Sequence, residues 1–309
     1  MKLAFLYAGQ GAQHVGMGRD LYEKYPAFAS VFDHAELPFD LKKLCFEGPE
    51  ETLSQTQYTQ PAMVAFAIGV TNVLKEAGIV PDMACGLSLG EYSALYAAGV
   101  WDAPTTLDLI AFRGQAMADA SKGLDVGMAA VLGLSADQLG PICKDASDGD
   151  QKVEMANFNC PGQIVISGDA QGVQKASEAA KAAGAKRVIP LKVSGPFHTS
   201  YMKPAGDALA KKFETLDFRA LQFPVLFNAI GDVKPEDQSI ADLLVKQVQQ
   251  SVYLEQSIRK MAEMGADTFV EIGPGKAMSG FVRKTIRGTK PMKIDTADDL
   301  DAVIQKLSK

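Results

Sequence analysis

A serine lies between two glycines where a short apolar run meets a helix-forming segment. In "ACGLSLGEYSAL", residues 84–95, Ser88 is the centre of a Gly-x-Ser-x-Gly motif completed by Gly86 and Gly90. A strand, a sharp turn and a helix in this order are what a nucleophile elbow requires. A serine at the start of a helix also lies beside backbone N–H groups that can stabilise an oxyanion. The motif therefore predicts a nucleophilic serine, and the alternative is a serine that only caps a helix.

A serine hydroxyl needs a general base to become a good nucleophile, and that base is most often histidine. The chain has three histidines, of which His34 lies in an amphipathic segment and is expected at the surface. His14 follows a glycine-rich segment, whereas His198 follows a predicted strand, where sheet-based enzymes carry catalytic groups. We therefore expect His198 to be the base, with His14 as the alternative. No carboxylate suited to orient the imidazole is evident, so a carbonyl oxygen is a candidate partner.

Apolar strand-like runs alternate with helical segments in the first part of the chain. Strand candidates at 2–8 and 82–86 are separated by helical stretches at 17–34 and 61–77. Such alternation predicts a parallel sheet flanked by helices. The expected architecture for this part is a larger α/β-hydrolase-like domain.

The pattern changes between residues 125 and 196. Two helical segments, 135–146 and 170–183, are interleaved with four strand-like runs at 127–134, 152–159, 163–169 and 187–193. This β-α-β-β-α-β order is typical of a ferredoxin-like unit. We therefore predict an α/β protein with a discontinuous catalytic domain, residues 1–124 and 197–309, into which a ferredoxin-like small domain, residues 125–196, is inserted.

Composition limits the possible compartments and partners. The 309 residues are 47% hydrophobic with a net charge of −6, so the whole molecule has no electrostatic reason to bind nucleic acid or anionic lipid. The first residues read as a strand and not as a secretory signal, and the most apolar stretch, 61–74, is shorter than the roughly 20 residues of a bilayer span. Four well-separated cysteines, Cys45, Cys85, Cys143 and Cys160, are expected to be buried thiols in a reducing compartment. The expected location is cytoplasmic.

One segment departs from the acidic character of the chain. Between residues 272 and 294 there is no acidic residue, and six basic residues occur: Lys276, Arg283, Lys284, Arg287, Lys290 and Lys293. We expect a local basic patch at the surface of an otherwise acidic protein.

Six motifs occur in a fixed order along the chain. Arg113 follows Ser88 by twenty-five residues, and the other five are "AGQGAQHVGMG", "GLSLGEYSAL", "NFNCPGQIVISG", "GPFHTSYMKPA" and "VEIGPGKAMSGF". Together they resemble the malonyl-CoA:acyl-carrier-protein transacylases, which are acyltransferases of fatty acid and polyketide synthesis. The resemblance extends from the first strand to about residue 285, and six motifs in register are far more specific than one.

The resemblance implies roles for individual residues. Ser88 is similar to the family's nucleophile and His198 to its general base, while the N–H groups of Gln10 and Leu89 resemble the oxyanion hole. Gln247 resembles the glutamine whose carbonyl orients the histidine, which would account for the missing carboxylate.

The resemblance also implies a substrate. Arg113 resembles the arginine that binds the free carboxylate of malonyl, and a buried guanidinium can hold a carboxylate by two parallel charge-assisted hydrogen bonds. The alternative for Arg113 is a surface position on a helix. Phe197 resembles a bulky residue that would crowd a branch on the α-carbon. Leu87 departs from the family, which usually has histidine before the nucleophile, and its effect on the elbow and on the pH profile is left open.

The implied reaction is a ping-pong transfer. Malonyl-CoA acylates Ser88 and releases CoA, and the phosphopantetheine thiol of acyl carrier protein then takes the malonyl group. No metal or redox cofactor is implied. Because carrier proteins of this kind are acidic, the basic stretch from Lys276 to Lys293 is a candidate docking surface, and a solvated helix face is its alternative.

Three other functions remain open on the sequence. A serine hydrolase or thioesterase acting on acyl-CoA shares the Gly-x-Ser-x-Gly motif, although its histidine normally lies near the chain end. The malonyl group could also be loaded for polyketide synthesis instead of fatty acid synthesis. A non-catalytic scaffold that binds acyl carrier protein is the third alternative, which the presence of Ser88, His198 and Arg113 disfavours.

Overall fold

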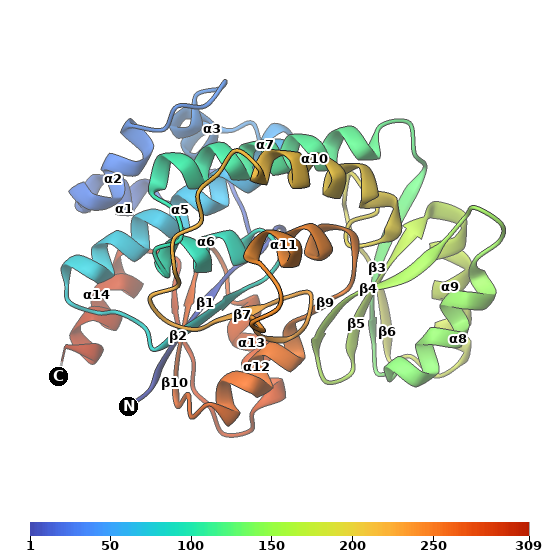
Figure 1. Ribbon diagram of the computed structural model, residues 1–309. Helices are drawn as coiled ribbons and strands as arrows, with labels where there is room; N and C mark the ends of the chain where they lie inside the picture. The colour runs from blue at the N-terminus through green and yellow to red at the C-terminus, as the bar shows by residue number, and fades with distance from the viewer. Residues whose placement is uncertain (309) are drawn as a thin grey trace. The chain divides into compact units, whose positions relative to one another are not determined.

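The computed structural model describes residues 1–308 and contains two compact units, each with a sheet of its own (Figure 1). Unit 1 comprises Met1–Gln115, Asp217–Phe227 and Ile258–Lys309, and unit 2 comprises Ala116–Leu216 and Asn228–Ser257. The protein is therefore a mixed α/β structure, as the alternation of strands and helices predicts.

The sheet of unit 1 is parallel and almost entirely buried. Its strands lie in the order β11 (Met292–Ile294), β10 (Thr268–Ile272), β1 (Leu3–Tyr7), β2 (Met83–Gly86) and β7 (Val225–Phe227), and each strand is parallel to its neighbours. Every residue of β1, β2 and β7 is buried, which is typical of a parallel sheet that is covered on both faces. The parallel sheet predicted from the sequence is confirmed.

Helices connect and cover these strands. The most apolar segment of the chain forms a long helix, α5 (Thr56–Glu76), whose side chains are mostly buried. The buried helix predicted around 61–77 is confirmed, and it begins five residues earlier. No helix within residues 1–308 is both long enough and apolar enough to cross a membrane. The other helices of unit 1 are α1 (Arg19–Lys24), α2 (Pro26–Asp33), α3 (Leu41–Glu47), α4 (Glu50–Leu53), α6 (Gly90–Ala97), α13 (Ala277–Thr285) and α14 (Ala297–Leu307), while α7 (Ala103–Ser121) and α12 (Leu254–Glu263) each contain residues of both units.

Unit 2 contains the β-α-β-β-α-β order predicted from the sequence. Its elements follow along the chain as β3 (Val126–Leu132), α8 (Ala136–Ala146), β4 (Val153–Cys160), β5 (Gln163–Asp169), α9 (Ala170–Ala182) and β6 (Arg187–Pro190). The strands lie in the order β6-β3-β5-β4, and α8 and α9 cover one face of this sheet (Figure 1). Buried aliphatic side chains of these helices and strands form one core. The capping box that begins α8 joins Ser135 to Gln138.

Further segments belong to unit 2. A fifth strand, β9 (Val252–Tyr253), pairs in parallel with β4, and the remaining elements are η1 (Ser200–Met202), α10 (Lys203–Phe213), β8 (Asp232–Val233) and α11 (Ile240–Gln249). Unit 2 is thus more extensive than residues 125–196, because it also includes residues 116–124, 197–216 and 228–257. The domain boundaries proposed from the sequence differ from these units and stay a prediction.

The elbow after β2 has room for glycine only, which gives a test of this part of the fold. A Cβ atom on Gly86 would lie 2.0 Å from the carbonyl carbon of Gly90, which is backbone and has no side-chain freedom to yield. We expect Gly86→Ala to lower the free energy of unfolding by at least about 2 kcal/mol.

A second glycine supplies the control. Gly280 lies inside α13, and a Cβ there would meet no atom within 4 Å. Gly280→Ala should raise the free energy of unfolding by about 0.5–1 kcal/mol, because alanine favours a helix interior over glycine. Chemical denaturation of both variants measures the two changes, and equal effects would contradict the crowded geometry at Gly86.

Candidate active site

Two residues hold strained backbone conformations. Ser88, with φ of 57°, and His198, with φ of 59°, are the non-glycine residues with positive φ within residues 1–308. This region is costly for residues with a side chain, and such strain clusters at functional sites. The two strained residues are the ones that the sequence analysis selected as nucleophile and base.

The turn that carries Ser88 is fastened to the end of β1. The N–H of Leu87 donates to the carbonyl of Tyr7, at 3.0 Å, and α6 begins two residues after Ser88. A Cβ on Gly9 would lie 2.9 Å from Cγ of Leu87, so the leucine packs directly on the backbone that precedes Gln10. In this chain an apolar contact therefore joins the elbow to the loop after β1, at the position where the sequence departs from the family pattern.

The guanidinium of Arg113 lies next to the serine. Its Nη2 donates to Oγ of Ser88 at 3.1 Å, and its Nη1 donates to Oε1 of Gln60 at 2.5 Å. Arg113 is fully buried, so the alternative of a surface position is wrong. Burial lowers the pKa of the Arg113 guanidinium, and the nearby Tyr92 and Glu91 oppose this shift.

A chain of hydrogen bonds extends from Arg113 to Gln10. Gln60 donates from Nε2 to Oγ1 of Thr56 at 2.9 Å, and the Thr56 hydroxyl donates to Oε1 of Gln10 at 2.8 Å. Thr56 and Gln60 are both buried in the first turns of α5. Sequence reasoning missed these two residues. Their signal was the presence of polar residues four positions apart at the start of an apolar helix.

His198 is held by a backbone carbonyl in unit 2. The imidazole is 4% exposed, and its Nδ1 lies 2.8 Å from the main-chain oxygen of Gln247 in α11. Because a carbonyl oxygen can only accept, Nδ1 carries the proton of this bond and Nε2 is the basic nitrogen of the neutral ring. The carbonyl partner expected from the sequence is present.

The remaining predicted residues are divided between unit 1 and unit 2. Gln10 and Leu89 lie in unit 1, where Leu89 is the residue before the first turn of α6, while the buried Phe197 lies in unit 2 directly before His198. Within unit 1 the structure brings Ser88, Arg113 and, through the hydrogen-bond chain, Gln10 together. The pairing of Ser88 with His198 joins residues of different units and stays a prediction.

Other nucleophiles and bases have different surroundings. All four cysteines are buried free thiols, as predicted, and burial raises the pKa of Cys45 and of Cys143 to about 12. These thiols are therefore protonated near neutral pH. His34 is exposed, as expected, and His14 is half exposed with its Nε2 3.9 Å from Oδ1 of Asp295.

Comparison with known proteins places this chain in a family. Residues 4–298 match the model of the acyl transferase domain. The chain is 44% identical over 308 residues to the malonyl CoA-acyl carrier protein transacylase of Bacillus subtilis (strain 168), covering 99% of this chain and 97% of that protein. This chain belongs to the acyl transferase family. The resemblance inferred from the six sequence motifs is confirmed.

Solved structures of acyl transferases agree with the fold. The malonyl CoA-acyl carrier protein transacylase of Clostridium perfringens has a TM-score of 0.94 at 39% identity, with 99% of this chain and 97% of that chain covered. A malonyl-transacylase in complex with its type II PKS acyl-carrier protein has a TM-score of 0.95 at 36% identity, with 99% of this chain and 100% of that chain covered. The two-sheet α/β architecture is thus shared over nearly the whole chain.

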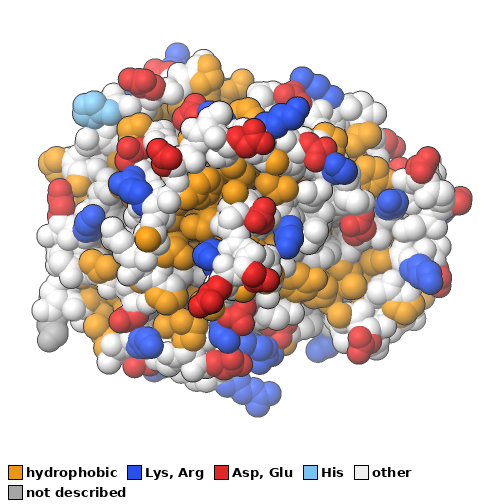
Figure 2. Space-filling view, in the orientation of Figure 1, with side chains coloured by type: hydrophobic (Ala, Val, Ile, Leu, Met, Phe, Trp, Pro, Cys, Tyr) orange, Lys and Arg blue, Asp and Glu red, His pale blue; other side chains and the backbone are white. Residues whose placement is uncertain are grey.

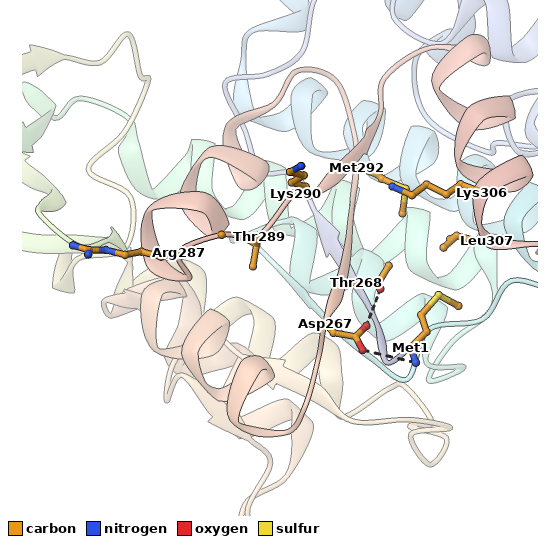
Figure 3. Close-up of a pocket in the computed structure, with 10 residues that line it drawn as sticks. Met1, Asp267, Thr268, Arg287, Thr289, Lys290, Met292, Lys306 and Leu307 are labelled. Atoms are coloured by element: carbon orange, nitrogen blue, oxygen red, sulfur yellow. Dashed lines mark hydrogen bonds and ion pairs between the residues drawn. The ribbon is translucent and has the colours of Figure 1, made fainter.

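Unit 1 of this acyl transferase contains a cavity of about 510 Å³ (Figure 3). It is lined by Met1, which precedes β1, and by Asp267, which precedes β10. In Figure 3 the Asp267 carboxylate contacts the N-terminal amine of Met1 and the hydroxyl of Thr268. The cavity therefore lies where these parallel strands begin, whereas Ser88 follows the end of β2.

The surface of the acyl transferase shows mixed charge. On the face in Figure 2, acidic and basic side chains are interspersed. Five members of the predicted basic patch are exposed, namely Lys276, Arg283, Lys284, Arg287 and Lys290. Lys293 is instead ion-paired, with Nζ 2.9 Å from Oδ2 of Asp299. The exposed basic residues of the patch thus lie on α13 and beside it.

Proposed function

We propose that this chain transfers the malonyl group from malonyl-CoA to the phosphopantetheine thiol of acyl carrier protein through a malonyl-Ser88 intermediate. The observation that carries the proposal is the buried Arg113 guanidinium, hydrogen-bonded to the hydroxyl of a serine in a strained elbow. The name of the Bacillus subtilis relative, which is 44% identical over 99% of this chain, supports the same reaction. A chain of this kind supplies malonyl units to fatty acid synthesis, and loading for polyketide synthesis is the alternative.

In the first half-reaction, Oγ of Ser88 attacks the thioester carbonyl of malonyl-CoA and His198 accepts the hydroxyl proton. The N–H groups of Gln10 and Leu89 stabilise the oxyanion, and the carbonyl of Gln247 holds the imidazole in the required tautomer. The carbon–sulfur bond then breaks, and the CoA thiolate leaves with the proton from His198. In the second half-reaction the carrier thiol gives its proton to His198 and attacks the ester, and Ser88 recovers its proton.

Arg113 selects the acyl group in this proposal. Its guanidinium holds the free carboxylate of malonyl by two parallel hydrogen bonds, which acetyl cannot form. Nη2 lies 3.1 Å from the serine oxygen, a separation compatible with the short three-carbon malonyl chain. A carboxylate held in this way leaves little room for a positioned water, which favours transfer over hydrolysis. Phe197 is proposed to crowd an α-methyl branch.

The finer description of the fold is also a proposal. The large domain is α/β-hydrolase-like, and the strand order β6-β3-β5-β4 with α8 and α9 supports a ferredoxin-like small domain. The boundaries remain 1–124 and 197–309 for the large domain and 125–196 for the small one. A cytoplasmic location is supported by four buried free cysteines.

Acyl carrier protein is proposed to dock on the stretch from Lys276 to Lys293. The exposed basic residues of α13 and its flank support this assignment, because charge complementarity guides the association of an acidic carrier. Lys293 contributes little to such a surface, since its ammonium is paired with Asp299.

Incubation with malonyl-CoA separates the proposal from its alternatives. A transferase accumulates a lasting malonyl-enzyme, a hydrolase or thioesterase releases malonate rapidly, and a scaffold does neither. We expect Ser88→Ala to abolish the covalent adduct, because this removes the nucleophile of the elbow. Intact-protein mass spectrometry measures the result. A full malonyl adduct on the variant would exclude Ser88 from the mechanism.

His198 is tested by the rate of acylation. We expect His198→Ala to lower the rate constant of malonyl-enzyme formation by roughly 10² to 10⁴, the range for the loss of a general base. Rapid-quench measurement of the adduct gives this constant. His14→Ala is the matched control and should retain the wild-type rate, whereas the reverse result would assign the base to His14.

Arg113 tests substrate identity. Arg113→Ala should lower kcat/KM for malonyl-CoA by roughly 10²-fold or more, because the malonyl carboxylate is left desolvated without its cationic partner. Transfer from acetyl-CoA should be unchanged or faster, so the selectivity should invert. Both values come from the same carrier-dependent assay. An equal loss for the two substrates would show that Arg113 has only a structural role.

A further inference from the structure

In unit 1 a series of aromatic side chains, each in contact with the next, begins at the Arg113 guanidinium. Cζ of Arg113 lies 5.3 Å from the centroid of the Tyr92 ring. The Tyr92 and Trp101 rings are stacked with centroids 6.3 Å apart and an interplanar angle of 19°. Phe218 meets Trp101 edge-on, with centroids 5.1 Å apart. We call these residues, Arg113, Tyr92, Trp101 and Phe218, the aromatic column.

The inner part of the column is closed to solvent. Arg113 and Tyr92 are 0% exposed and Trp101 is 3% exposed. A cation over an aromatic face is attracted by the negative ring face, and the attraction is strongest where both groups are desolvated. The Tyr92 ring is therefore in a position to stabilise and orient the buried guanidinium.

We propose that Tyr92, supported by Trp101, fixes the plane of the Arg113 guanidinium and thereby sets the preference for a carboxylate-bearing acyl group. The inference rests on the proposed function, because it assigns to Tyr92 a role in substrate selection that acts through Arg113. Tyr92 is a positioning residue and does not itself contact the substrate.

Besides the hydrogen bond to Ser88, two contacts of different kinds bear on the orientation of the guanidinium. The hydrogen bond from Nη1 to Gln60 restrains rotation within the guanidinium plane, since it fixes one edge. Cζ of Arg113 lies over the Tyr92 ring, 5.3 Å from its centroid, and we infer that the ring restrains the tilt of the guanidinium plane. A bidentate carboxylate contact needs both restraints, because its two hydrogen bonds are parallel and coplanar with the guanidinium.

The sequence order of the column explains how it is assembled. Tyr92 lies in α6, directly after the elbow of Ser88, and Arg113 lies in α7. Trp101 is in the short connection between these helices. The ring that holds the guanidinium and the serine that receives the acyl group are therefore four residues apart on one rigid segment.

Tyr92→Leu removes the ring and keeps an apolar side chain, whereas Tyr92→Phe keeps the ring. We expect Tyr92→Leu to lower kcat/KM for malonyl-CoA by about 10- to 30-fold and to leave acetyl-CoA transfer within about threefold of wild type. Tyr92→Phe should retain the malonyl to acetyl ratio within about threefold. Phe28→Leu is the matched control, because Phe28 is an equally buried aromatic residue of unit 1 that packs on Phe32 and Phe66.

A double-mutant cycle distinguishes positioning from a general loss of stability. If Tyr92 acts through Arg113, then Tyr92→Leu should change malonyl transfer less than threefold in an Arg113→Ala background. Thermal unfolding of each variant shows which losses arise from unfolded protein, and Phe28→Leu should lower the melting temperature without changing the malonyl to acetyl ratio.

The inference is overturned if Tyr92→Leu lowers malonyl and acetyl transfer equally, or if its effect is undiminished in the Arg113→Ala background. Failure of the proposed function would give a different result. In that case Arg113→Ala itself would leave the ratio of malonyl to acetyl transfer unchanged. An inverted selectivity in Arg113→Ala together with a wild-type ratio in Tyr92→Leu would reject the column and retain the function.

Discussion

The Arg113 guanidinium is a permanent positive charge buried beside Ser88, and the contacts around it depend on this burial. A guanidinium removed from water is costly unless its donors and its faces find partners. In this chain the start of α5 supplies an amide oxygen, α6 supplies an aromatic face and the elbow supplies a hydroxyl. Separate helices thus converge on one side chain. In the proposed reaction, the carboxylate of the malonyl group is a further partner of this guanidinium.

Backbone strain at Ser88 and His198 reflects a second constraint. Each residue holds a positive φ at a turn where a strand or loop gives way to a helix. The surrounding packing maintains both conformations: crowded glycines surround the elbow, and the carbonyl of Gln247 holds the imidazole. Strain of this kind orients a reactive side chain before any substrate arrives, so less ordering is needed during the reaction.

The sequence predicted those features that depend on local pattern. Gly86 and Gly90 revealed the elbow, alternation of apolar runs revealed the parallel sheet, and the order of elements in unit 2 followed from periodicity. Thr56, Gln60 and Tyr92 were not predicted, because their roles arise from contacts between segments that are distant in sequence. Strand β9 was not predicted for the same reason, since it joins the sheet of unit 2 from almost a hundred residues away. The resemblance in motif order pointed to Arg113 and Gln247, which local sequence pattern alone does not distinguish.

Trp101 gives the aromatic column a property beyond packing. It is the only tryptophan of the chain. Fluorescence excited at wavelengths that tyrosine does not absorb therefore comes from this one indole. That indole is separated from the guanidinium by a single ring. Indole emission responds to nearby charge, and in the proposed reaction the acyl carboxylate is a negative charge brought next to Arg113. The unlabelled chain therefore carries its own optical probe of the surroundings of Arg113.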